Sequence, residues 1–267
     1  MRLRLIPGAA LQGSLRALVL GSLAAPLVGV LRGPEGERAL PLTILRTSAA
    51  LGAALARAGV QVALAAVGGL SADTAYQVTV RAGERQPRSQ GGSLDLEQSL
   101  VLRTLPAALP AEGLGLCWAS CYYDGYNGDH GYRDALLRAR QQGPLAFKIL
   151  GGDNLYLDVG PGQARHLDAY QETLERYLLY FLRSGYAEVL ATLPTLVTFD
   201  DHDFWNNYPE AQPHLLRSLP PLRHSYQAAA RDALDLFQLP LNPPGVDGGL
   251  GHSFTFDVAP VSFFVAD

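Results

Sequence analysis

Three short segments of the chain hold side chains that could bind metal ions. They are Cys121, the run Gly152-Asp153-Asn154-Leu155-Tyr156 and the run Asp200-Asp201-His202-Asp203. Carboxylates and a phenolate are hard ligands for divalent or trivalent cations, and a thiolate shifts the preference towards a transition metal such as iron. Three acids around one histidine would crowd negative charge, which a bound cation relieves. The three segments therefore predict a metal site.

Each of these residue types also has a common structural explanation that does not involve a metal ion. A lone cysteine such as Cys121 is usually a small buried side chain. An aspartate after two glycines, as at Asp153, is common turn chemistry, and Tyr156 fits a half-buried aromatic position. Asp200 could cap a helix. The spacing of Asp153 and Tyr156, three positions apart on one tight loop, favours metal binding by this pair.

Each segment follows a predicted apolar strand. The strands cover about 114–118, 145–150 and 195–199, and their carboxyl ends lead directly into the candidate ligands. In an open α/β sheet, the loops beyond the carboxyl ends of the strands converge on one crevice. Residues about 80 positions apart, such as Cys121 and Asp201, are therefore expected to meet in space.

The stretches between these strands predict helices over about 132–142 and 165–184, with a short helix before the third strand. The longer helix carries one apolar stripe, and Gly185 is a fitting stop. The stripe consists of Leu167, Tyr170, Leu174, Tyr177, Leu178 and Phe181. Alternating strands and helices imply a layered α/β domain with a largely parallel sheet over residues 109–267.

Residues 1–108 have the pattern of β structure. In the stretch 75–81, Tyr76, Val78 and Val80 face one way and polar residues face the other, and the same period recurs before Pro106. Short strands with frequent turns, and a polar loop over 84–93, suggest a small sandwich. Residues 49–58 are alanine-rich and could be helical. A linker over 105–113, with two prolines, separates this part from the α/β domain.

The last residues predict a hairpin of strands over 253–258 and 261–266 around Ala259-Pro260. The sequence stops at Asp267 directly after the second strand, and a central-looking strand is a poor place to end a domain.

Composition narrows the function classes. The chain has 267 residues, of which 48% are hydrophobic, and a formal charge of -4, which predicts a folded core and no nucleic-acid-binding surface. Cys117 and Cys121 do not form a disulfide framework. The uncharged stretch 17–31 resembles a signal peptide, but its turn residues favour a pair of strands, and about 15 residues are too few to span a bilayer. The compartment stays open, with the cytoplasm slightly favoured over export.

Other polar residues are weaker candidates. A loop with Asp124, Asp129 and His130 could line a substrate mouth, although a surface loop is the more ordinary explanation. Arg217 and Arg223 could contact a phosphate. The remaining histidines, at 166, 214, 224 and 252, show no spacing typical of a ligand set.

The motifs together resemble the PhoD-like alkaline phosphatase and phosphodiesterase family of calcineurin-like metallophosphoesterases. That family carries a Ser-Cys pair, a GDxxY motif and a DDHE or DDHD motif with trailing asparagines, in this order. The chain has Ser120-Cys121, then 152–156, then 200–203 followed by Asn206 and Asn207. The family also begins with an immunoglobulin-like domain, and 69–78 is similar to its closing strands.

The resemblance implies roles for individual residues. Iron (Fe³⁺) would be bound by Cys121, Asp153 and Tyr156, and Asp153 would bridge to a second cation, suspected to be calcium, with other divalent metals as alternatives. The second site would use Asp200, Asp201 and an asparagine, Asn207 or its neighbour Asn206. Asp201 and His202 would be the catalytic residues, with His202 assisting the leaving group. The implied reaction is hydrolysis of a phosphomonoester or phosphodiester by a metal-bound hydroxide.

The family continues beyond the point where this sequence ends and supplies further metal ligands there, so the resemblance implies a truncated product or a fragment. The rival hypothesis is therefore a catalytically inactive fragment or a binding module that lacks the C-terminal ligands. The sequence leaves the natural substrate and the oligomeric state open.

Overall fold

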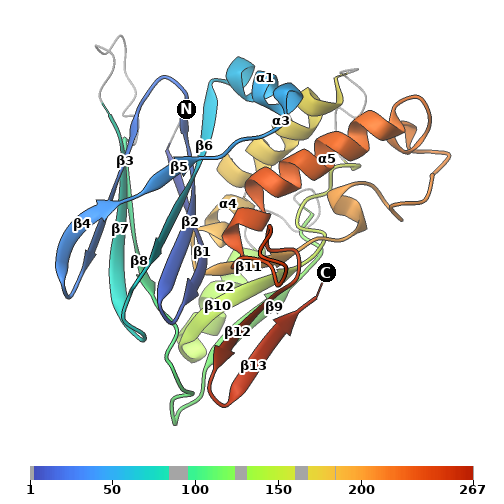
Figure 1. Ribbon diagram of the computed structural model, residues 1–267. Coiled ribbons are helices and arrows are strands. Elements are labelled where there is room, and N and C mark those ends of the chain that lie inside the picture. Colours follow the sequence, from blue (N-terminus) through green and yellow to red (C-terminus); the bar gives the residue numbers. More distant parts are fainter. Residues whose placement is uncertain (1–2, 84–95, 124–130, 160–167, 184, 267) are drawn as a thin grey trace.

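The computed structural model describes residues 3–83, 96–123, 131–159, 168–183 and 185–266 (Figure 1). The polar loop expected over 84–93 lies outside these residues, as do Asp124, Asp129, His130 and His166. In the described part of the chain, no helix is long and apolar enough to cross a membrane.

Antiparallel strands of the first part form two four-stranded sheets. One sheet has the order β1 (Arg4–Leu11), β2 (Ser14–Ser22), β6 (Val60–Gly68), β5 (Leu42–Ile44), and the other β4 (Gly36–Leu40), β3 (Leu27–Gly33), β7 (Ala75–Ala82), β8 (Glu97–Arg103). The apolar faces of the two sheets share one core. The alternation predicted in β7 is confirmed, because Tyr76, Val78 and Val80 are buried in that core. Within 17–31, residues 17–22 belong to β2 and 27–31 to β3, as the strand interpretation predicts.

The outer face of the first sheet is covered by helices (Figure 1). The alanine-rich stretch forms helix α1 (Ala49–Ala58), which begins after Ser48 and ends at Gly59 in the left-handed conformation (φ 67°). Ile6 and Leu18 of the sheet pack in one cluster with residues of α1, α3 (Ala169–Leu182) and α5 (Arg223–Phe237). The largest apolar cluster therefore joins residues from both sides of position 108.

The second part is built around a three-stranded parallel sheet, as predicted. Its order is β11 (Thr195–Thr198), β10 (Leu145–Gly151), β9 (Gly115–Ala119). Helices α2 (Gly131–Gln142) and α4 (Gly185–Leu190) pack near Cys117 on one face. The carboxyl ends of the three strands therefore point to the same edge.

The boundaries of the long helix differ from the expectation. Helix α3 begins after Asp168, whose Oδ1 accepts hydrogen bonds from the amides of Tyr170 and Gln171, both at 3.1 Å. Arg183 is its C-cap, and Gly185 begins α4 instead of stopping α3. Gly185 is buried as the first residue of α4.

The terminal hairpin, β12 (Phe254–Val258) and β13 (Val261–Val265), forms a sheet of its own. Phe256 packs edge-on against Phe147 of β10, with ring centroids 5.5 Å apart, so the hairpin covers one face of the parallel sheet. Trp118 of β9 pairs in register with Ile149 of that sheet, yet 61% of its surface is exposed.

Lys148, the single lysine of the chain, is buried in β10 (1% exposed). Its ammonium group donates to Thr195 Oγ1 at 2.7 Å and to the carbonyls of Leu190 and Leu193 at 3.3 and 2.7 Å. Burial lowers the pKa of Lys148 to about 7. This side chain ties β10 to the turn before β11.

Candidate metal centre

The loops after the three parallel strands touch one another through their backbones. Gly152, directly after β10, has φ 92°, and a Cβ placed on it would lie 2.6 Å from the Cβ of Asp200. Only glycine fits this approach and this conformation. The loop after β9 joins in, because the amide of Cys121 donates to the carbonyl of Gly152 at 3.2 Å. Three segments distant in sequence thus form one surface.

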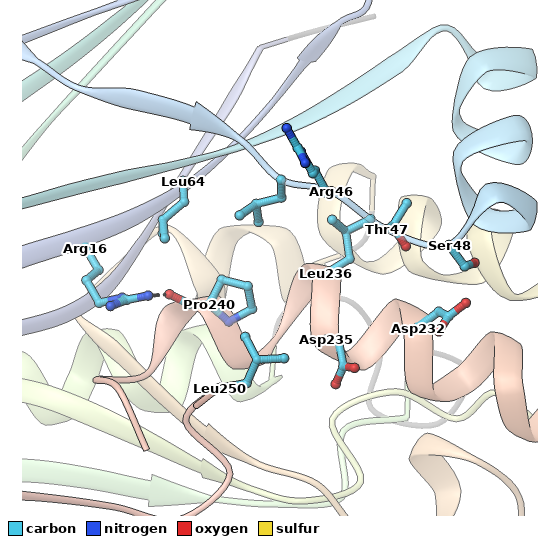
Figure 2. Close-up of a pocket in the computed structure, with 11 residues that line it drawn as sticks. Arg16, Arg46, Thr47, Ser48, Leu64, Asp232, Asp235, Leu236, Pro240 and Leu250 are labelled. Carbon is cyan, nitrogen blue, oxygen red and sulfur yellow. Dashed lines mark hydrogen bonds between the residues drawn. The ribbon is translucent and has the colours of Figure 1, made fainter. Parts of the chain in front are cut away.

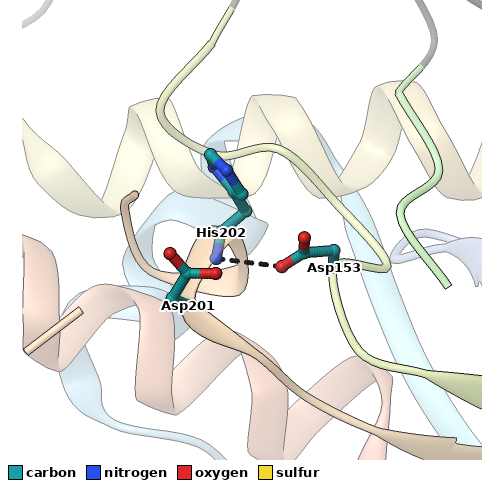
Figure 3. Close-up of side chains that lie close together, drawn as sticks. All are labelled: Asp153, Asp201 and His202. Atoms are coloured by element: carbon teal, nitrogen blue, oxygen red, sulfur yellow. Dashed lines mark hydrogen bonds between the residues drawn. The ribbon is translucent and has the colours of Figure 1, made fainter. Parts of the chain in front are cut away.

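Three side chains on this surface form a compact group of possible metal ligands, Asp153, Asp201 and His202 (Figure 3). One potential ligand atom of each lies within 4.8 Å of the others. Asp153 is 7% exposed and has φ 51°, while the other two are half-buried. The amide of His202 donates to Oδ1 of Asp153 at 3.2 Å, which fixes this carboxylate against the loop after β11.

The second oxygen of Asp153 faces the other two predicted iron ligands. Cys121 Sγ lies 3.5 Å from Asp153 Oδ2, and the hydroxyl of Tyr156 lies 3.4 Å from the same atom. Cys121 is exposed and has φ 61°, an uncommon conformation for a cysteine. The ring of Tyr156 stacks on that of His202 at 4.2 Å between centroids. A thiol, a carboxylate and a phenol therefore meet at one point.

The electrostatics of this point favour a positive ligand. Burial raises the pKa of Asp153, and the negative charge of Asp201 raises it further, against the opposing effect of the His202 amide. Burial, followed by the charges of Asp153 and Cys121, also raises the pKa of Tyr156. A cation between these groups would stabilise their charged forms, so the donor set fits a hard or borderline metal ion.

His202 is held by an acid that the sequence reasoning missed, Asp158. His202 Nδ1 lies 2.8 Å from Asp158 Oδ1, and the amide of Asn206 donates to Oδ2 at 2.8 Å. Burial lowers the pKa of His202, but the Asp158 hydrogen bond and charge, with those of Asp153 and Asp201, raise it overall. The only signal in the sequence was an acid five residues after Asp153 in the same loop.

Asp200 and Asn207 lie at the border of the group. Asp200 is exposed and caps the short helix η1 (Asp201–Asp203), with its Oδ1 accepting from the Asp201 amide at 2.8 Å. Asn207 has φ 58°, and its backbone amide donates to Asp201 Oδ2. Both residues therefore help to place Asp201, and Asp200 is not one of the three acids and histidines grouped in Figure 3.

The two arginines considered for phosphate binding have internal partners. Arg217 is buried, with its guanidinium bound to the Leu157 carbonyl and to Glu172 Oε1 at 2.6 Å. Its guanidinium therefore links the Leu157 carbonyl to Glu172. Arg223 donates to the Pro209 carbonyl and lies over the ring of Trp205. Of the remaining histidines in the described chain, those at 214, 224 and 252 do not join the group.

A cavity of about 290 Å³ lies elsewhere, between the β5–α1 connection and α5 (Figure 2). Arg16, Ser48, Asp232 and Asp235 are among its lining residues, and none of the metal-centre residues is. Within the described chain, one buried oxygen of Asp232 and one of Asp235 have no hydrogen-bond partner.

Comparisons with known proteins support the fold. No protein-family model and no curated protein sequence matches the chain. The solved structure of PhoD matches with a TM-score of 0.60 and 17% identity over 98% of this chain and 50% of that chain. The purple acid phosphatase PPD1 from seeds of yellow lupin (Lupinus luteus) matches with a TM-score of 0.59 and 10% identity over 99% of this chain and 44% of that chain. At these identities the likeness shows a shared fold. The chain spans about half the length of the structures it matches.

Proposed function

We propose that the chain carries part of a metal-dependent phosphoesterase of the PhoD-like type, acting on phosphomonoesters, phosphodiesters or both. The observation that carries this proposal is the convergence of Cys121, Tyr156 and His202 on the two oxygens of Asp153. A shared fold with two phosphatases supports a hydrolase, and the donor set supports metal-assisted chemistry.

The ligand chemistry supports two cations beside Asp153. Cys121, Asp153 and Tyr156 offer a thiolate, a carboxylate and a phenolate, which suit iron. Asp201, with Asp200 or Asn207 at the border, offers oxygen ligands for calcium or another divalent ion. Bound cations would supply charge neutralisation at the phosphoryl oxygens and would acidify a water.

His202 is the proposed proton donor to the leaving oxygen. Because Asp158 accepts the Nδ1 proton, Nε2 remains for the substrate, and the raised pKa of His202 favours the protonated ring. Asp153 accepts a hydrogen bond from the backbone amide of His202, and the ring of Tyr156 stacks on the imidazole face. These contacts support a role for His202 in holding the transferred proton.

The proposal extends to the domain organisation. Residues 1–108 would be an immunoglobulin-like sandwich domain and 109–267 the first part of the catalytic domain. The rival function is a catalytically silent fragment or binding module, and the observation that favours it is the half-length coverage of both solved structures.

Metal content separates the two functions. The purified full chain is loaded with ferric iron and calcium, and bound metal is measured by mass spectrometry together with hydrolysis of a chromogenic phosphodiester. The phosphoesterase proposal expects stoichiometric iron, a visible absorption band from the bound phenolate of Tyr156, and turnover. A colourless chain without metal and without turnover would establish the rival.

A further inference from the structure

A closed hydrogen-bond network lies beneath the metal centre, around Gln238 at the C-terminal end of α5. Gln238 is 1% exposed, Asn154 is 3% exposed and Asp203 is fully buried. Asn154 follows Asp153 directly, and Asp203 lies two residues after Asp201. The network therefore joins the two loops that carry the candidate ligands.

The direction of each hydrogen bond in the network is fixed. The carbonyl of Thr198 can only accept, so the amide nitrogen of Asn154, at 2.6 Å, must face it. The same nitrogen donates to Gln238 Oε1 at 2.9 Å. Gln238 Nε2 then faces Asp203 Oδ1, at 3.0 Å, and the hydroxyl of Tyr177, also at 3.0 Å.

The second oxygen of Asp203 completes the network. Oδ2 accepts from the amide of Asp200 at 3.1 Å and from the amide of Asn154 at 3.4 Å. Both carboxylate oxygens are thus used as acceptors, and one side chain contacts the backbone of both loops. If Gln238 becomes a carboxylate, two buried acceptors face each other. If Asp203 becomes an amide, two buried donors face each other.

The surroundings of the network are apolar, with Tyr177 and Phe237 stacked at 5.0 Å between centroids. A buried polar network in such a place adds little net stability compared with apolar packing, but it defines one geometry when every member is satisfied. Because the network lies between the two loops that carry the candidate ligands, the geometry it defines is the relative position of those loops.

We infer that Gln238 and Asp203 are positioning residues that set the separation of Asp153 from Asp201 and His202. The inference rests on the proposed function in one respect only, namely that the separation set by Gln238 and Asp203 serves metal binding. The cross-loop bond from the His202 amide to Asp153 Oδ1 reports the same separation without any metal.

A swap of the two partners tests the inference. Gln238→Glu keeps the oxygen that accepts from Asn154 but removes the N–H that donates to Asp203. In Asp203→Asn, the new NH₂ group must face another donor, which is either Gln238 Nε2 or the backbone amides of Asn154 and Asp200. The double variant restores a donor opposite an acceptor at every position, with one carboxylate and one amide in the pair as before. Gln77→Glu, on the exposed face of β7, is the matched control.

The primary measurement is hydrogen exchange of the His202 amide in the metal-free full chain. Each single variant is expected to speed this exchange about tenfold or more, because a buried unpaired group costs enough to open the loops. The double variant should return exchange to within about threefold of the parent, where additive effects would give about a hundredfold increase. Val80, in the sandwich core, should keep its exchange rate throughout.

Titration with Mn²⁺ alone gives the second measurement. The single variants are expected to weaken Mn²⁺ binding about tenfold or more, and the double variant to recover it. Unchanged His202 exchange in both single variants, or a double variant that is worse than either, overturns the inference. A parent chain that binds no Mn²⁺ while His202 exchange follows the swap refutes the metal site and leaves the positioning role standing.

Discussion

The amide nitrogen of His202 and Oδ1 of Asp153 are joined by a hydrogen bond of 3.2 Å between residues 49 positions apart in the chain. This bond orients the Asp153 carboxylate so that its other oxygen faces Cys121 and Tyr156. One side chain is therefore shared between all three loops of the candidate centre.

Substitution of Asp153 should remove metal binding. In Asp153→Asn, an amide oxygen can still accept from the His202 amide, but the negative charge is lost. We expect metal affinity to fall by at least about 100-fold and phosphodiester hydrolysis to disappear. Calorimetric titration and a chromogenic assay measure both effects, and Asp257→Asn on the exposed side of β12 is the control. Hydrolysis at the parent rate in Asp153→Asn would refute the assignment.

Substitution of His202 should affect the chemical step according to the leaving group. If this ring donates a proton to the leaving oxygen, His202→Gln lowers kcat about 10²- to 10⁴-fold for an alkyl ester and much less for a nitrophenyl ester. A series of esters with leaving groups of different pKa measures the dependence. His224→Gln, exposed on α5, should behave as the parent. Equal losses for all esters would assign His202 to metal binding instead.

The contact between Gly152 and Asp200 predicts a specific loss of stability. Gly152→Ala places a Cβ 2.6 Å from the Cβ of Asp200 and forces an alanine to φ 92°. We expect the free energy of unfolding to fall by about 1–3 kcal/mol and the metal centre to weaken. Urea denaturation measures the loss. Gly143→Ala is the control, because a Cβ there meets nothing within 4 Å; equal effects at both positions would contradict the close-contact explanation.

Lys148 predicts a pH dependence of stability. Burial lowers its pKa from 10.5 to about 7, so between these values the unfolded chain binds a proton that the folded chain does not. The free energy of unfolding should therefore rise with pH in this window, by at most about 1.4 kcal/mol per pH unit, and fall as the pH drops towards 7. Denaturation at about pH 7.5 and about pH 8.5 measures the slope. Lys148→Met should flatten it and Arg38→Met should not; identical slopes in all three proteins would show that Lys148 does not titrate in this range.

Local patterns predicted much of the fold. The alternation in β7, the alanine-rich α1 and the three strands before the ligand loops all follow from spacing within one segment. The meeting of Asp153 with Asp201 also followed, because parallel strands bring their carboxyl ends to one edge. The expected role of Gly185 as the stop of the long helix was wrong, because Arg183 caps α3 and Gly185 is a buried residue that begins α4.

Long-range hydrogen bonds could not be predicted in the same way. Gln238 lies 84 residues from Asn154 and 35 from Asp203, and no spacing rule connects them. Asp158 and Arg217 have ordinary sequence surroundings, and only the folded chain shows that one holds His202 and the other ties Leu157 to Glu172. The polar residues that hold a site in place through long-range hydrogen bonds therefore cannot be predicted from a single sequence.

The contrast between Trp118 and Trp205 gives the chain an internal optical probe. Trp118 is 61% exposed and covers Gly151 at the end of β10, whereas Trp205 is fully buried four residues after Asp201. These are the two tryptophans of the sequence. A water-soluble quencher therefore suppresses the emission of Trp118 first, and the blue-shifted light that remains comes from the loop that follows β11. Fluorescence can then follow events at the ligand loops without any added dye.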